Sequence, residues 1–146
     1  MEPVEPAARI LAATLTASEA GEAQTPLDLA AAAQRLWHRL HHHFSKVLGV
    51  DGFRTILDHS LAQTRQQFPW LIAAQTDSAG TLTGLSDCMA ELSPTEAGDG
   101  LTSLLAHFIQ ALAGLVGVRL ALRLMQRTSP EIDLSGIASR WEGARS

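Results

Sequence analysis

The chain contains 146 residues, of which 46% are hydrophobic and 18% are charged. This size and composition exclude a disordered chain and fit one domain that buries its own hydrophobic core. The formal net charge of −4 argues against a general nucleic-acid-binding protein, and the single cysteine, Cys88, excludes an internal disulfide. We therefore expect one all-helical domain over residues 1–146, with partly flexible tails, in the reducing cytoplasm. The excess of arginine over lysine and the abundance of alanine point to a bacterial source.

The amino-terminal part predicts two helices and a break. Residues 6–16 form a short apolar run after an acidic start, which is a helix pattern and not a secretory signal. Residues 25–28, Thr-Pro-Leu-Asp, combine a capping side chain, a proline suited to the first helical position and a carboxylate for a capping box. The helix that begins there is expected to run to Leu48 and to end at Gly49.

Further helices are expected after this glycine. One covers residues 51–67, and Pro69 interrupts the pattern that follows it. Residues 75–84 have the composition of a loop, and residues 85–92 that of a short helix. Residues 93–96, Ser-Pro-Thr-Glu, then repeat the capping chemistry of the first start signal.

The carboxyl-terminal segment, residues 129–146, predicts one more helix, which would start at Ser129. Its apolar residues are Ile132, Ile137 and Trp141. They would dock either on the bundle or on a partner, and the sequence leaves both possibilities open.

Two parts of the chain share a pattern at an offset of 68 residues. The two capping signals align, and so do Gly49 and Gly117. The aligned apolar positions are Leu36 with Leu104, Leu40 with Phe108, Phe44 with Leu112, and Ile56 and Leu57 with Leu124 and Met125. Chance would not readily preserve the caps, the prolines and the glycines together with the apolar spacing. We therefore interpret residues 25–67 and 93–127 as an internal duplication.

Each unit is a helix, a break and a second helix, and each carries an apolar stripe that it cannot bury alone. The stripe of the first unit consists of Leu29, Ala33, Leu36, Leu40, Phe44, Val47 and Leu48. That of the second unit consists of Leu101, Leu104, Leu105, Phe108, Leu112 and Leu115. Packing the stripes face to face predicts an all-α helical bundle with pseudo-twofold symmetry and extra helices at both termini.

The helix of residues 101–125 is apolar on more than one face, which favours the centre of the bundle or a subunit interface. We predict that it forms a homodimer or binds an unidentified protein partner. The interaction surface would consist of Leu105, Ile109, Leu112, Val116, Arg119, Arg123 and Arg127. The three arginines follow one another at four-residue spacing, so they share one helix face, which would be solvated or would bind an acidic partner or phosphates.

An alternative for residues 101–118 is a membrane-spanning helix, since this stretch contains no formally charged side chain. Polar residues such as Ser103, His107 and Gln110 dilute it, and its length only reaches the lower limit of roughly 18 apolar residues for a span. We therefore expect a buried core helix and no membrane partner.

The histidines of residues 38–43 suggest two kinds of chemistry. The first is metal binding, because His38 and His42 are four residues apart and share a helix face. A complete site needs at least one more protein ligand, and no glutamate lies between these two histidines. We favour a solvated helix face and expect no metal and no cofactor.

The second kind of chemistry is phosphotransfer. His43 and the only lysine, Lys46, have the spacing found around the phosphoacceptor of histidine phosphotransfer domains, which are helical bundles of about this size. A small residue usually follows that lysine, whereas Val47 follows it here. We keep phosphotransfer through His43 as an alternative function.

Catalytic motifs are missing from the rest of the sequence. Asp87 beside Cys88 would disfavour a reactive thiolate, and the loop of residues 75–84 lacks the lysine of a phosphate-binding loop. We therefore predict a small non-catalytic regulatory or protein-interaction module and not an enzyme.

Overall fold

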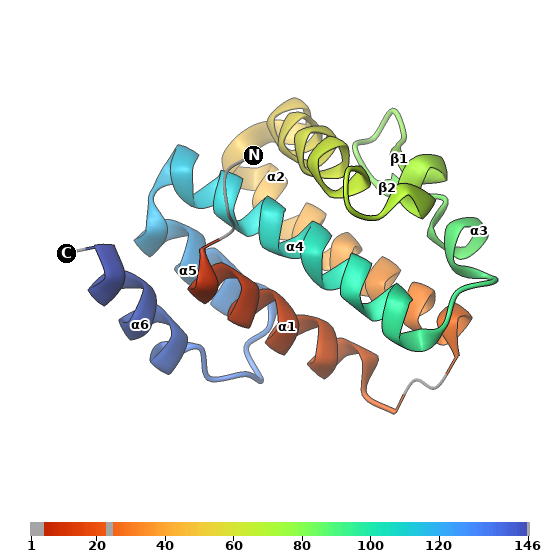
Figure 1. Ribbon diagram of the computed structural model, residues 1–146. Coiled ribbons are helices and arrows are strands. Elements are labelled where there is room, and N and C mark those ends of the chain that lie inside the picture. The colour runs from red at the N-terminus through yellow and green to blue at the C-terminus, as the bar shows by residue number, and fades with distance from the viewer. Residues whose placement is uncertain (1–4, 23–24, 146) are drawn as a thin grey trace.

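The computed structural model describes residues 5–22 and 25–145. Six α-helices account for most of these residues, so the fold is all-α, as the sequence predicts (Figure 1). The helices are α1 (Pro6–Ala20), α2 (Pro26–Arg65), α3 (Leu85–Met89), α4 (Pro94–Val116), α5 (Val118–Thr128) and α6 (Ser135–Arg145). A 3₁₀ turn, η1 (Pro69–Ala73), and an antiparallel pair of short strands, β1 (Gln75–Thr76) and β2 (Leu82–Thr83), lie between α2 and α3.

Both predicted start signals cap a helix. Thr25 Oγ1 accepts a hydrogen bond from the Asp28 backbone N–H over 3.1 Å, and Ser93 Oγ accepts one from the Glu96 backbone N–H over 3.2 Å. Each side chain satisfies one of the amide groups that a helix leaves unpaired at its start. The proline that follows each cap has no amide hydrogen to satisfy, so it suits the first helical position.

Both predicted glycine breaks are present, and they share one backbone conformation. Gly49 (φ 78°, ψ 162°) bends α2, and Gly117 (φ 94°, ψ 152°) separates α4 from α5. This region of backbone space is open essentially to glycine alone. The chain therefore changes direction at both points without the strain that a side chain would add, and helix resumes at the next residue.

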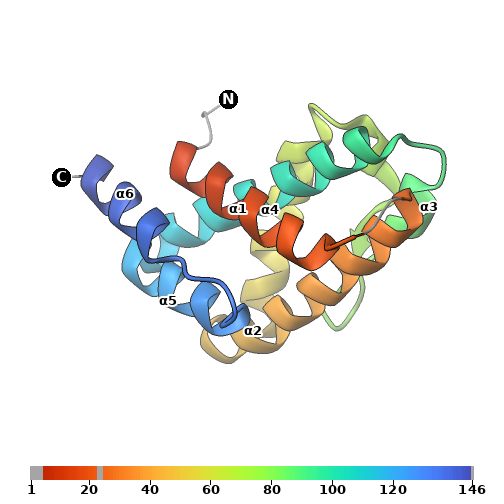
Figure 2. The same cartoon turned by 90° about the horizontal axis from the view of Figure 1, so that it is seen from below.

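Helix α4 is the centre of the bundle and packs against α1, α2 and α5. Figure 2, seen from below, shows α1 lying across α4 with α2 beside them. Aromatic rings join α2 to α4: the ring centroid of Phe108 lies 5.1 Å from that of Trp37, 5.9 Å from that of Phe44 and 5.3 Å from that of Phe53. All four rings are buried, and such aromatic pairs add about 0.5–1.5 kcal/mol each beyond the burial of their area.

Two positions of the predicted apolar stripes lie outside the core. Val47 is 49% exposed and Leu115 is 65% exposed. They occupy aligned positions in the last turn before Gly49 and Gly117, at the end of the bundle where each helix leaves the packed core. The stripe prediction is therefore wrong at one position in each unit, and it is the same position.

The stretch between α2 and α4 closes the other end of the bundle (Figure 1). The expected loop of residues 75–84 contains the β1–β2 pair, which is too short to leave an alternating pattern in the sequence. Gln34 Nε2 of α2 ties this pair to the bundle by donating to Leu82 O over 2.7 Å. Trp70 of η1 lies against Gly100 of α4, where a Cβ atom would come within 2.2 Å of the indole ring.

The last helix begins later than the sequence predicts, at Ser135 and not at Ser129. Asp133 Oδ1 accepts a hydrogen bond from the Ser135 backbone N–H over 3.0 Å and so marks the start of α6. Of the two docking possibilities for this segment, the structure selects the bundle. Trp141 is 2% exposed, and α6 packs against α1 and α5.

Helix α4 is the one described helix that is long and apolar enough to cross a membrane by length and composition. Of its most apolar 18-residue window, 61% is buried inside the protein. The contacts with α1, α2 and α5 account for this burial. Their extent fits the core helix that the sequence predicts.

Candidate interaction surface

Three of the residues predicted to form an interaction surface are inside the protein. Leu105, Ile109 and Leu112 are each no more than 1% exposed. Other helices of the same chain cover them, since α4 packs against α1, α2 and α5. The prediction is therefore corrected for these three side chains: they form the core and present no surface to a partner. Val116 is partly buried and packs against the same core.

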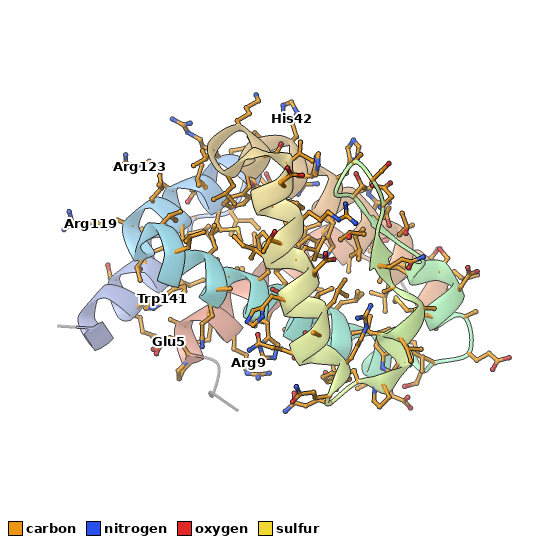
Figure 3. All side chains as sticks on the ribbon, turned by 90° about the horizontal axis from the view of Figure 1, so that it is seen from above. Glu5, Arg9, His42, Arg119, Arg123 and Trp141 are labelled. Carbon is orange, nitrogen blue, oxygen red and sulfur yellow. The ribbon has the colours of Figure 1, made fainter. Side chains whose placement is uncertain are left out.

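The three arginines of the predicted surface are exposed on α5. Arg119, Arg123 and Arg127 are spaced by four residues and therefore lie along one face of the helix. Figure 3 shows Arg119 and Arg123 projecting from the same side of the molecule. Within the described part of the chain, neither Arg123 nor Arg127 forms an ion pair, whereas Arg35, Arg39 and Arg54 of α2 do.

The same arginines line an open groove between α5 and α6, with a volume of about 560 Å³. The lining residues are Arg119, Leu122, Arg123, Gln126, Arg127, Leu134, Ser135 and Ala138. Gln126 fixes one wall, because its Oε1 accepts a hydrogen bond from the Leu134 backbone N–H over 3.1 Å. The groove thus combines guanidinium groups with an apolar lining. Sequence reasoning missed it because it depends on where α6 lies.

Arg39 ties α2 to the end of α5. Its Nε donates to Thr128 O over 3.2 Å, and its Nη1 lies 2.8 Å from Glu19 Oε1 of α1. The Glu19 side chain is only 14% exposed, which makes this pair less screened than an ordinary surface ion pair. Arg39 therefore holds three helices together, and it brings His43, one turn further along α2, close to Arg127.

His43 is partly buried among positive charges. Burial lowers the pKa of its imidazole, and the charges of His42, Lys46, Arg127 and Arg39 lower this pKa further. The rings of His42 and His43 are in edge contact, with centroids 5.2 Å apart. We use the name basic rim for His42, His43 and Lys46 of α2 together with Arg119, Arg123 and Arg127 of α5.

Exposed apolar side chains are found at the glycine breaks. Val47 and Val50 flank Gly49, and Leu115 precedes Gly117. Both breaks lie toward the same end of the bundle in Figures 1 and 2. We call Val47, Val50 and Leu115 the apolar tip. In the sequence the tip is next to residues of the basic rim: Val47 follows Lys46 directly, and Leu115 lies at the end of α4, before the Gly117 break that leads to Arg119 on α5.

The opposite end of the bundle carries a group of exposed carboxylates, and Arg65 of α2 donates there to the backbone oxygens of Leu71 and Ala74. From residue 66 to residue 118 the sequence contains no lysine and no arginine. Asp87, Glu91, Glu96 and Asp99 are exposed on α3, on the turn after it and at the start of α4. Carboxylates stabilise helix starts, and both α2 and α4 begin at this end (Figure 1). This separation of charge depends on which helix ends meet, so the arginine spacing alone did not reveal it.

The other histidines of the cluster have surface or packing positions. His38 and His42 are both exposed on α2, and no group of three or more potential metal ligands occurs in the described part of the chain. His41 packs edge-on against Phe53 with ring centroids 5.1 Å apart, and its Nε2 lies 2.8 Å from Ala79 O. His41 thus holds the β1–β2 turn against α2.

The basic rim can pair guanidinium groups with carboxylates or phosphates, and the apolar tip offers exposed apolar side chains. Comparisons with models of protein families, with curated proteins and with solved structures find no match for this chain. Its function is therefore inferred from the chemistry of its own surface.

Proposed function

We propose that this chain is a small non-catalytic protein-interaction module that binds an acidic partner protein. The basic rim is the binding surface, and the apolar tip extends it. One observation carries the proposal: cationic side chains from two helices gather around His43, and the exposed side chain of Val47 follows Lys46 in the same helix. In a chain of net charge −4, so local a concentration of positive charge attracts and orients an acidic partner.

The geometry of α5 suits a short row of carboxylates. A guanidinium group donates two parallel hydrogen bonds to one carboxylate, which gives specificity as well as affinity. Arg123 and Arg127 form no ion pair with a described residue, so neither has to break such a pair when a partner binds. Contacts with the apolar tip would add the desolvated centre that protein interfaces typically contain.

A protein suits this surface better than a nucleic acid or a membrane. The net charge of −4 opposes a long polyanion that would reach beyond the rim. Membrane-surface helices insert aromatic and leucine side chains, whereas the apolar tip holds two valines and one leucine and no aromatic residue. A short acidic segment needs to contact only the rim.

A second copy of this chain is the other partner that the sequence suggests, with residues 101–125 as the interface. Since Leu105, Ile109 and Leu112 are buried, a second copy would have to place its acidic end on the basic rim of the first. Such a head-to-tail contact either closes into a ring or builds assemblies of growing length. We place the acidic partner first and include self-association among the outcomes of the test.

The test is the binding of a fluorescent oligoglutamate peptide, measured by anisotropy at low and at physiological salt. We expect saturable binding that weakens as salt rises, because salt screens exposed charges. Arg123→Ala and Arg127→Ala are each expected to weaken binding by up to about fivefold, since an exposed ion pair contributes roughly 0.2–1 kcal/mol. Arg54→Ala, which removes an exposed arginine of α2 paired with Asp58, is the matched control.

Two outcomes would contradict the proposal. One is the absence of saturable binding at low salt, and the other is an equal loss of affinity for Arg54→Ala and Arg123→Ala. Analytical ultracentrifugation of the unliganded protein tests whether the partner is a second copy of this chain. Species that grow with concentration would favour a second copy over an acidic partner.

Phosphotransfer through His43 is a second candidate function, and the charges around this residue favour it. The lowered pKa keeps the imidazole neutral, and therefore nucleophilic, at neutral pH. Lys46 and Arg127 would neutralise part of the charge of a phosphoryl group. Partial burial of His43 and the bulk of Val47 act against close approach of a donor protein. The test is an acid-labile, alkali-stable phosphate label from a phosphorylated response regulator, which His43→Ala must abolish.

We also infer that the two helix–break–helix units arose by duplication and are related by a pseudo-twofold axis. Aligned buried hydroxyl groups support this inference: Ser60 Oγ donates to Ile56 O over 2.8 Å, and Thr128 Oγ1 donates to Leu124 O over 3.0 Å. In Figure 1 the first part of α2 and α4 run in the same direction, the second part of α2 passes above α4, and α5 passes below it. Superposing one unit on the other in an experimental structure tests the inference, which requires both glycines to coincide.

A further inference from the structure

A small polar pocket lies between the second part of α2 and α4, with a volume of about 190 Å³. The lining residues are His59 and Gln63 of α2 and His107, Gln110, Ala111 and Gly114 of α4. Most of the interface between these helices is apolar, so this group of imidazoles and amides stands out from its surroundings. None of these residues belongs to the basic rim or to the apolar tip.

His107 is the buried polar group of this pocket. It is 7% exposed, and its ring lines the pocket. In the described part of the chain, the buried side-chain atom that lacks a hydrogen-bond partner is Ser103 Oγ and not a ring nitrogen of His107. The pocket is the side from which a ligand can reach this ring.

The charges that act on His107 are positive. Burial lowers the pKa of its imidazole most, and Arg9 of α1 and His59 of α2 lower this pKa further. Figure 3 shows Arg9 and Glu5 on the same side of the molecule. The backbone N–H of Glu5 donates to Gln110 Oε1, which fixes the orientation of one amide in the lining.

We propose that this pocket binds a small oxyanion, the carboxylate or phosphate group of a small molecule. The imidazole N–H groups of His59 and His107 and the amide of Gln63 are the donors, and Arg9 adds attraction at longer range. The volume is below the roughly 300–1,000 Å³ of pockets for drug-sized ligands, so the ligand is small.

A metal ion is a poorer occupant of this pocket. The lining contains two imidazoles, and no group of three or more potential ligands occurs in the described part of the chain. A zinc site needs at least three protein ligands. The positive charge of Arg9, which already acts on His107, would also repel a cation.

Oxyanion binding is coupled to protonation of the pocket. A bound anion stabilises the imidazolium form, so its binding raises the pKa of His107. The groups of the packed helices whose charges act on this ring are Arg9 from α1 and His59 from α2. The affinity for an oxyanion therefore increases as the pH falls into the range in which His107, with its lowered pKa, takes up a proton.

The test is an NMR titration of the histidine Cε1–H signals with inorganic phosphate and, separately, with acetate. We expect saturable shifts of the His59 and His107 signals with at least one of these anions, and a rise in the pKa of His107 at saturation. The signal of His38, which is exposed on the first part of α2, is the internal reference and should not move. The difference between the phosphate and acetate arms identifies the preferred oxyanion.

His59 is exposed, so a variant of this residue tests the proposal even where a substitution of the buried His107 prevents folding. His59→Ala is expected to weaken anion binding about tenfold, which is the loss for one hydrogen bond to a charged group. His38→Ala is the matched control and should bind like the wild type, as should Arg123→Ala, which changes only the basic rim. Unmoved His59 and His107 signals at millimolar phosphate and acetate would overturn the proposal. So would equal affinities of His59→Ala and His38→Ala, or shifts that appear with zinc and with neither anion.

Discussion

The first helix of each unit begins with the same kind of cap and ends at the same kind of glycine, yet the two helices have different surroundings. Helix α4 is buried along most of its length, because α1, α2 and α5 pack around it. The first part of α2 has one buried face, and its other face carries the exposed residues His38, His42 and Lys46. The aligned residues of α4 are Ala106, Gln110 and Gly114.

This difference separates two properties of a helix: where it starts and ends, and how many of its faces are covered. The start and the end of each helix depend on a few neighbouring residues, so they are the same in both units. The number of covered faces depends on which other helices pack there, and α1 packs more extensively on α4 than on α2. The α2 residues of the basic rim lie on the face of this helix that other helices leave exposed. Substitutions at aligned positions of the two units can therefore test the helix ends and the covering of the helix faces separately.

The largest effects are expected from the matched core residues Phe108 of α4 and Leu40 of α2, both fully buried. Phe108→Ala should lower the free energy of unfolding by about 3–5 kcal/mol and Leu40→Ala by about 2–5 kcal/mol. Phe108 is expected to give the larger loss because its ring contacts three other aromatic rings. Urea denaturation followed by circular dichroism measures both losses. A loss below about 1 kcal/mol for Phe108→Ala would show that α4 is not the central helix.

Alanine substitutions at the two glycine breaks should lower the free energy of unfolding equally. Gly49→Ala and Gly117→Ala are each expected to lower the free energy of unfolding by about 1–3 kcal/mol, because both glycines have a backbone conformation that strains other residues. No other atom lies near the position of an added Cβ at either site, so backbone strain is the whole effect. Gly98→Ala, inside α4 and equally uncrowded, is the control, and it should stabilise the protein by up to about 1 kcal/mol. A neutral effect at only one break would contradict the equivalence of the two units.

The sequence predicts the local parts of this fold and not the parts that depend on contacts between distant segments. It predicts the caps at Thr25 and Ser93, and also the two glycine breaks, because their signals lie within a few residues. It does not predict that Val47 and Leu115 are exposed, since their apolar spacing is the same whether or not another helix covers them.

The candidate surfaces show the same division. The arginine spacing on α5 predicts one shared face, and the three arginines are exposed along it. The predicted interface at Leu105, Ile109 and Leu112 is wrong because the cover comes from α1 and α2, which are far away in sequence. The pocket at His59 and His107 has no sequence signal, since it forms only where α2 and α4 meet.

The two helix caps should have smaller and equal effects. Thr25→Ala and Ser93→Ala each remove a side-chain acceptor from one backbone N–H group. Each is expected to lower the free energy of unfolding by about 0.5–2 kcal/mol, whereas Thr25→Ser should be nearly neutral. Thermal denaturation of the three variants provides the comparison. A loss at one cap and none at the other would mean that the two starts are not equivalent.

The pH dependence of stability is the subtlest comparison between the units. The folded-state pKa values of His43, in the first unit, and His107, in the second, are lowered chiefly by burial. The unfolded chain then binds more protons, so the free energy of unfolding should decrease as the pH falls below about 6.5 and be constant above it. His43→Gln and His107→Gln should each reduce this decrease, and His38→Gln should leave it unchanged. Urea titrations from neutral to mildly acidic pH would contradict the account if stability rose toward low pH.

The most direct test of the proposed interaction surface is an amide NMR map of the protein during titration with an oligoglutamate peptide. We expect the shifts to concentrate at Lys46, Arg119, Arg123 and Arg127 and at the neighbouring glycine breaks, and to disappear at high salt. Signals from the acidic start of α4 and from the His59–His107 pocket should stay in place. Shifts spread evenly over the surface, or confined to residues outside the basic rim and the apolar tip, would contradict the account.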